Sequence, residues 1–111
     1  MSREYAADDI VEAVVDEYSN AILTATSADP IAVKEITDDI GISPATAYRR
    51  IGQLVDLDLL EERTWIDETG TQTHVYEANF ESIKIEIVNG ISYLHIVSET
   101  NHDLTRIWDY R

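Results

Sequence analysis

Apolar residues recur every three or four positions over residues 7–26, and this spacing predicts a helical region with one buried stripe. The stripe includes Ile10, Val14 and Ile22, while carboxylates cover the opposite side. A break near Asp16 would divide the region into two shorter helices. Either arrangement places an amphipathic helical layer at the start of the chain.

Two further helices and a tight turn are predicted next, over residues 31–57. Residues 31–40 carry apolar side chains at helical spacing, and Gly41 follows as a left-handed C-cap residue would. Ser43 and Pro44 then begin a third helix, because Ser caps helix starts and Pro suits the first turn. The pattern is typical of a helix-turn-helix.

Two hairpins are predicted after the helices. Residues 62–78 alternate around a loop that contains Gly70, and residues 82–97 flank Asn89-Gly90, a strong signal for a two-residue hairpin. Residues 101–110 are predicted to form a short terminal helix. The expected fold is α+β, mainly α: one domain over 1–111, a winged helix-turn-helix with an extra C-terminal β-hairpin and a short terminal helix.

The outward face of the third helix stands out by its chemistry. With Ala47, Ile51 and Leu54 turned to the core at about 100° per residue, the outward and flanking positions hold Ala45, Thr46, Tyr48, Arg49, Gly52 and Gln53. The chain has 22 Asp+Glu against 8 Lys+Arg, yet residues 41–55 contain no carboxylate. A face without carboxylates in so acidic a chain indicates an anionic partner.

The residue types on this face suit double-stranded DNA. Arginine pairs with guanine and glutamine with adenine, so Tyr48, Arg49 and Gln53 are expected at base edges or phosphates. Arg50 and Lys34 would contact phosphates and set the register, and Ser43 with the helix amides could hold another. The expected DNA-binding residues are Lys34, Ser43, Ala45, Thr46, Tyr48, Arg49, Arg50, Gln53, Arg63 and His74. Alternatively, this is an ordinary surface helix whose arginines pair with Asp38, Asp39 or Asp56.

The net charge of −14 opposes DNA binding, since nucleic-acid binders are usually basic. One interpretation is an acidic surface that repels nucleic acid. The other is adaptation to molar salt, where the Debye length is about 3 Å and the repulsion is screened. Only two of the cations are lysines, Lys34 and Lys84, and that depletion favours salt adaptation.

Catalytic and metal chemistry is not indicated. There is no cysteine, no HExxH motif, no nucleophile–base pair and no glycine-rich phosphate loop, so we expect neither an enzyme nor a cofactor. A metal site at His95, Glu99, His102 and Asp103 is a minor alternative. No apolar run approaches the roughly 18 residues of a membrane helix, and the first residues lack a secretory signal, so a cytoplasmic location is expected.

Residues 31–78 resemble the winged helix-turn-helix of ArsR-like regulators. The run from Gly41 to Ile51 resembles their turn and recognition helix, Leu59-Leu60-Glu61-Glu62 their passage into the wing, and Thr64–Glu77 the wing itself. The acidic balance makes haloarchaeal members the most similar. The resemblance implies homodimers with the third helix in the major groove. It also has departures: no Lys or Arg lies between Thr64 and Ile83, and the metal-sensing cysteines are absent.

The expected function is therefore a sequence-specific, double-stranded DNA-binding transcription regulator that acts as a homodimer. The apolar stripes of residues 5–26 and 101–110 suggest dimerisation through the termini, because one small chain would not bury both. The basal transcription machinery is a further expected partner. The alternative function is a winged-helix protein-interaction module within a transcription assembly that does not bind DNA directly.

Overall fold

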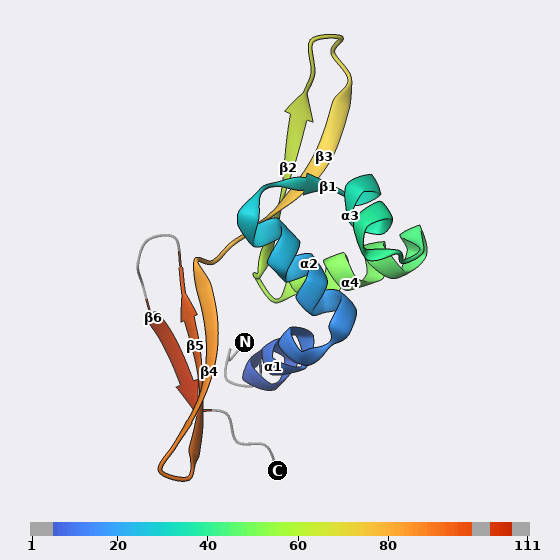
Figure 1. The fold of residues 1–111 in the computed structure, drawn as a ribbon. Coiled ribbons are helices and arrows are strands. Elements are labelled where there is room, and N and C mark those ends of the chain that lie inside the picture. The colour runs from blue at the N-terminus through green and yellow to red at the C-terminus, as the bar shows by residue number, and fades with distance from the viewer. Residues whose placement is uncertain (1–5, 99–102, 108–111) are drawn as a thin grey trace.

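The computed structural model describes residues 6–98 and 103–107. Within these residues the helices come first and the hairpins follow (Figure 1). The helices are α1 (Ala6–Val15), α2 (Glu17–Ala28), α3 (Val33–Ile40) and α4 (Pro44–Asp56). The strands are β1 (Ile31–Ala32), β2 (Leu60–Ile66), β3 (Gln72–Ala78), β4 (Ser82–Val88), β5 (Ile91–Val97) and β6 (Asp103–Ile107).

The first helical region is broken at Asp16, at the position that the sequence offered for a break. Asp16 has extended backbone angles, and its carboxylate accepts a hydrogen bond of 2.9 Å from the backbone N–H of Ser19. It therefore caps α2 and satisfies one of the amides that a helix start leaves free. The chain changes direction here, so that α1 and α2 each turn an apolar side inward.

The helix-turn-helix is formed as predicted by α3, the turn and α4. Gly41 has φ of 77° and donates its N–H to the carbonyl of Thr37, which ends α3 in the left-handed conformation that glycine allows. Ser43 caps α4, accepting a hydrogen bond of 3.2 Å from the N–H of Thr46. The expected start of α3 was two residues early, because Ile31 and Ala32 pair as β1 with β3 instead.

One core joins the helices to both sheets. The side chains of Ile22, Ile36, Ile51 and Leu54 are almost fully buried, and Leu94 of β5 belongs to the same cluster with no exposed surface. Burial removes this apolar surface from water, which is the main driving force for the fold. Of the apolar stripe of α1 and α2, Ile10, Val11 and Ile22 are buried within the single chain, whereas Val15 is 70% exposed.

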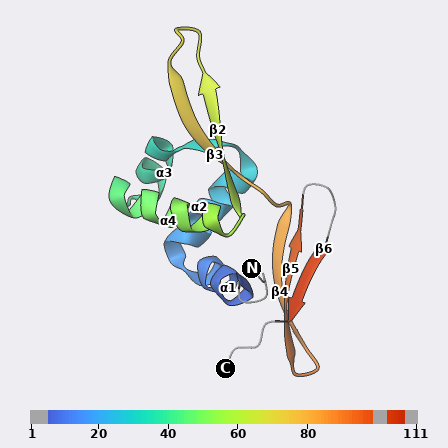
Figure 2. The same cartoon turned by 180° about the vertical axis from the view of Figure 1, so that it is seen from behind.

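The strands form two separate antiparallel sheets. The first has the order β1-β3-β2, and its hairpin β2–β3, the wing, projects beyond the helices (Figure 1). The second has the order β4-β5-β6, and its β4–β5 turn points away from the wing tip in both views (Figure 2). Asn89 and Gly90 both have positive φ, 52° and 78°, as a type I′ turn requires. Both hairpins occur where the sequence predicted them.

The predicted terminal helix at residues 101–110 is wrong where the structure describes it. Asp103–Ile107 form β6, which pairs antiparallel with β5 and places Ile107 beside Tyr93 and Asp103 beside Val97. Strand β5 would otherwise present a second edge of unpaired backbone groups, and the returning chain satisfies them. Long-range pairing has overridden a local pattern that also fits a helix.

Candidate nucleic-acid interface

The outer face of α4 consists of Ala45, Tyr48, Arg49, Gly52 and Gln53, all of them exposed. The opposite side of α4 is buried through Ala47, Ile51 and Leu54. Core burial on one side therefore fixes which side chains the helix presents to a partner, as the helical spacing predicted. Among the described residues Arg49 forms no ion pair, so its guanidinium is available for a ligand.

A groove runs between the start of α3, helix α4 and the wing, and we call it the wing groove. It has a volume of about 320 Å³ and is lined by Val33, Lys34, Tyr48, Glu62, Gln72, Thr73, His74 and Tyr76. Three residues that the sequence singled out, Lys34, Tyr48 and His74, thus come together from three different elements. Tyr48 is 59% exposed, so its ring stands at the mouth of the groove rather than in the core.

Glu62 lies among these residues, and sequence reasoning missed it. Its carboxylate accepts a hydrogen bond of 3.2 Å from the hydroxyl of Tyr76 and lies 2.9 Å from Nδ1 of His74. Burial, and then the negative charge of Glu62, raise the pKa of Tyr76, so that this phenol stays protonated. The cross-strand register of Glu62 and Tyr76 could have revealed the contact, had the hairpin register been assigned.

Arg63 faces away from the wing groove. Successive residues of a strand point to opposite faces, and Glu62, Tyr76 and His74 occupy the groove side. Arg63 forms ion pairs with Glu77 across the strand and with Glu61 at 3.7 Å. The structure therefore does not bring Arg63 together with the other predicted site residues.

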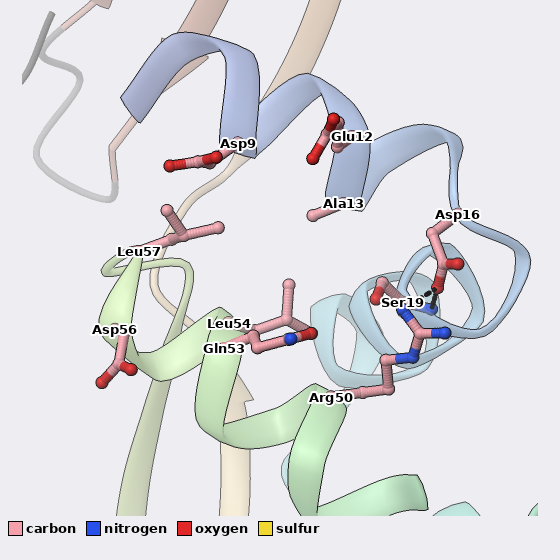
Figure 3. Close-up of a pocket in the computed structure, with 10 residues that line it drawn as sticks. All are labelled: Asp9, Glu12, Ala13, Asp16, Ser19, Arg50, Gln53, Leu54, Asp56 and Leu57. Carbon is pink, nitrogen blue, oxygen red and sulfur yellow. Dashed lines mark hydrogen bonds and ion pairs between the residues drawn. The ribbon is translucent and has the colours of Figure 1, made fainter. Parts of the chain in front are cut away.

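Arg50 also lies apart from the outer face of α4. Its side chain is 25% exposed and its guanidinium is 3.2 Å from the carboxylate of Asp16, the cap of α2 (Figure 3). The hydrogen bonds that Ser19 donates to the Asp16 carboxylate and, to a lesser extent, the charge of Arg50 lower the pKa of Asp16. Asp16 is none of the aspartates that the surface-helix alternative had named. Arg50 thus ties α4 to the α1–α2 junction.

This ion pair lies at one side of a cavity of about 510 Å³ between α1 and α4. Figure 3 shows its lining: Asp9, Glu12, Ala13, Asp16, Ser19, Arg50, Gln53, Leu54, Asp56 and Leu57. Gln53 therefore borders both the cavity and the outer face of α4. The acidic rim makes this side of α4 unsuited to a phosphate, in contrast to its outer face.

The first turn of α4 holds Ser43, Ala45 and Thr46. The Ser43 hydroxyl donates a hydrogen bond of 3.0 Å to the Thr46 hydroxyl, in addition to its capping role. Ala45 is exposed beside them. The Thr46 and Ala47 N–H groups are bonded to Ser43 and Pro44 has no N–H, so the helix start offers the N–H of Ala45 beside short side chains that allow close approach of a phosphate.

The wing tip differs from the outer face of α4 because it carries a carboxylate, Asp67, which accepts hydrogen bonds within the turn. A side-chain oxygen of Asp67 accepts hydrogen bonds from the backbone N–H groups of Thr69 and Thr71, each 2.9 Å, and from the Thr69 hydroxyl at 2.7 Å. These bonds lower the pKa of Asp67. The Asp67 carboxylate therefore holds the turn that Gly70 completes.

Metal and membrane chemistry find no support in the described part of the chain. No three His, Asp or Glu side chains gather there as ligands of an ion. The metal site that the sequence offered as a minor alternative includes residues 99 and 102, which lie outside the described residues. His95, another of its candidate ligands, contacts Glu86 at 3.2 Å. No helix among the described residues is both long and apolar enough to cross a bilayer.

The arrangement of α3, α4 and the wing defines a winged helix-turn-helix fold. A family model described as a helix-turn-helix domain matches residues 16–63, from the cap of α2 into β2.

The fold is similar to the solution structure of a homodimeric winged helix-turn-helix DNA-binding domain from Mycobacterium bovis, a possible ArsR-family transcriptional regulator. The TM-score is 0.52 at 23% identity, over 70% of this chain and 71% of that one. A search of curated proteins gave no match.

Proposed function

We propose that the protein is a sequence-specific, double-stranded DNA-binding transcription regulator that acts as a homodimer. The single observation that carries this function is the outer face of α4, which is free of carboxylates and presents Arg49 without an ion-pair partner among the described residues. In a helix-turn-helix this helix enters the major groove, where arginine and glutamine read base edges. Arg49 and Gln53 are the specificity residues of the proposal.

The wing groove supports the same orientation. Lys34 of α3 and Tyr48 of α4 line the wing groove. A DNA strand leaving the major groove would pass on this side of the wing. Lys34 contacts a phosphate in this arrangement, and the Ala45 N–H with the short side chains of Ser43 and Thr46 accommodates another. Arg50 and Arg63 have no direct DNA contact in this arrangement, because carboxylates of the same chain engage both.

A homodimer would read two half-sites. The similar domain from Mycobacterium bovis is homodimeric. Two α4 helices related by a twofold axis fit half-sites one DNA turn apart, about 34 Å. The regulator would act where the DNA is, in the cytoplasm, by blocking or recruiting the transcription machinery.

The test is selection from a random duplex pool, in about 2 M KCl where screening is nearly complete, followed by sequencing of the retained DNA. A twofold-symmetric enriched motif supports the proposal, and Arg49→Glu should retain no motif. Arg63→Glu is the matched control, because it reverses the same charge at a residue that faces away from the groove. Enrichment that survives Arg49→Glu would refute the proposed interface.

A protein-interaction module is the second candidate, and the wing favours it. The two wing residues that the sequence nominated, Arg63 and His74, both contact glutamates, so the wing contributes little positive charge to a phosphate backbone. A folded protein that enriches no duplex, and whose partner binding is unaffected by Arg49→Glu, would establish this alternative.

We also propose that the acidic surface is an adaptation to high salt, as in haloarchaeal regulators. The support is compositional: 22 acidic residues against 8 basic ones. Folding should then strengthen as KCl rises to molar concentration, measured by urea unfolding. Affinity for DNA should depend weakly on salt above about 1 M, because exposed carboxylates such as Glu68 take up cations while basic groups release them. A steep fall in affinity there would contradict it.

A further inference from the structure

Strand β4 forms an open edge of the second sheet. The sheet order is β4-β5-β6, and among the described residues β4 pairs only with β5. An edge strand presents unpaired N–H and C=O groups to any strand that can align with it. This edge spans seven residues, Ser82–Val88, and contains no proline or glycine to interrupt pairing.

The backbone groups that point outward belong to the three isoleucines of β4. The type I′ turn at Asn89-Gly90 closes on the pair Val88 and Ile91, which fixes Val88 as bonded to β5. Bonded and free positions alternate along an antiparallel edge. The N–H and C=O groups of Ile83, Ile85 and Ile87 therefore face away from β5.

The open edge also carries exposed apolar surface. Ile87 is 75% exposed, and its neighbours Val88 and Ile91 at the hairpin tip are exposed as well. Leu94 on the central strand is completely buried, whereas Ile83 and Ile85 on β4 are only partly buried.

The sequence of β4 is self-complementary when it runs antiparallel to itself. A twofold axis at Ile85 aligns all seven residues with those of a second copy, Ser82 opposite Val88 at each end. It places Lys84 opposite Glu86 twice, and Ile83 opposite Ile87 twice. Each outward-pointing backbone residue then meets another, so the hydrogen bonds match as well.

Other registers are worse for stated reasons. An axis at Lys84 or at Glu86 would place two like charges directly opposite each other, which is destabilising. An axis between two residues, such as Ile85 and Glu86, would set bonded positions of one strand against free positions of the other. An axis at Ile83 or Ile87 leaves part of each strand unpaired and removes the contact between opposite charges.

We propose that β4 pairs with β4 of a second copy of this chain, which joins the two second sheets into one continuous antiparallel sheet. The contact is isologous, as a twofold homodimer requires. It specifies the interface of the homodimer proposed above, and it is independent of whether that dimer binds DNA. The wing and the outer face of α4 take no part in the contact.

A charge-swap experiment tests the register. Lys84→Glu places two glutamates opposite each other, and Glu86→Lys places two lysines opposite each other. Each variant alone should dimerise about tenfold more weakly than the wild type, because attractive pairs become repulsive at two symmetric places. An equimolar mixture of the two variants should regain wild-type affinity, since every mixed pair is again of opposite charge.

Sedimentation velocity measures the association without DNA, at the lowest KCl concentration at which circular dichroism shows a folded protein. Glu81→Lys is the matched control: it has the same charge change as Glu86→Lys, lies just outside the paired strand, and should dimerise as the wild type does. Arg49→Glu should also dimerise normally, which separates this interface from the DNA-binding proposal. Ile87→Thr, at a side chain largely exposed in the single chain, should weaken the dimer as well.

Three results would each overturn the interface. The first is a wild type that remains monomeric at high micromolar concentration. The second is normal dimerisation of both charge variants, which would place the contact elsewhere. The third is a mixture that associates no better than its components. If a charge variant fails to fold, an Ile87→Thr protein that dimerises as the wild type does would also refute the pairing.

Discussion

Helix α4 and the wing border the same groove, but their exposed arginines differ in whether they form ion pairs. On α4, Arg49 stands on an outer face without carboxylates and forms no ion pair among the described residues. On the wing, Arg63 contacts Glu77 and Glu61, and His74 contacts Glu62. Helix α4 offers Arg49 to a partner, whereas Arg63 and His74 of the wing contact glutamates of the same chain.

The difference shows what makes a cation available in so acidic a protein. The chain has 22 acidic residues, and two of the three arginines whose side chains the structure describes, Arg50 and Arg63, form ion pairs with them. A strand pair places residues of both strands side by side, so Arg63 meets glutamates directly. The outer face of α4 avoids this because no carboxylate occurs from residue 41 to 55. Local exclusion of acids, rather than net charge, therefore identifies the candidate interface.

The contrast between α4 and the wing would be wrong if neutralising Arg49 and neutralising Arg63 lowered DNA affinity equally. Arg49→Gln should weaken binding to the selected duplex by about ten- to a hundredfold, since a bidentate base contact contributes about 1–3 kcal/mol. Arg63→Gln should leave the affinity nearly unchanged, because its charge is already balanced within the wing. Fluorescence anisotropy with both variants at one salt concentration gives the two values directly. Equal losses would place the wing in direct contact with DNA.

Arg50 belongs to α4 but, like Arg63 of the wing, it forms an ion pair with a carboxylate of the same chain. Substitutions of its partner Asp16 test the role of this pair. Asp16→Ala removes the α2 cap and the partner of Arg50, and should lower the free energy of unfolding by about 1–2 kcal/mol. Asp16→Asn retains capping ability but not the charge, so it should cost less. Urea unfolding measures both variants, and DNA affinity should not change in either.

The same substitution carries a pH signature. Because the folded state lowers the pKa of Asp16, its stabilisation is complete above the ordinary carboxyl range near pH 4 and is lost as the pH falls through the lower, folded value. Acid should therefore destabilise the wild type more than Asp16→Ala. An identical decline of both proteins below pH 4 would show that Asp16 is not responsible.

The smallest expected effect comes from removing a carboxylate from the wing, so that its groove side resembles the carboxylate-free outer face of α4. Glu62→Gln removes a negative charge from the wing groove, and should raise DNA affinity by a few-fold at moderate ionic strength, where screening is incomplete. The pKa of Tyr76 should fall toward its ordinary value, because one of its two main causes is lost. Ultraviolet titration measures the phenol.

Glu61→Gln is the matched control for Glu62, since it lies on the other face of the same strand. It should change neither the DNA affinity nor the titration of Tyr76. A gain in affinity with Glu61→Gln as large as with Glu62→Gln would mean that only the total charge of the wing matters.

Sequence patterns predicted most of the fold because they carry local signals. Helix α4 follows from the Ser43-Pro44 start and the spacing of Ala47, Ile51 and Leu54, and its outer face follows from the same spacing. The second hairpin follows from Asn89-Gly90. The final segment was predicted incorrectly because whether it forms a helix or a strand depends on the free edge of β5, a distant partner.

The sequence by itself determined the order of the elements, the turn at Gly41 and the chemistry of the α4 face, because capping, turn geometry and periodicity act within a few residues. Only the tertiary structure decided which charges remain available. It paired Arg50 with Asp16 and Arg63 with Glu77, placed Glu62 in the wing groove, and left β4 at an edge that no other described strand covers. These outcomes depend on contacts between residues far apart in the chain, and local pattern does not specify them.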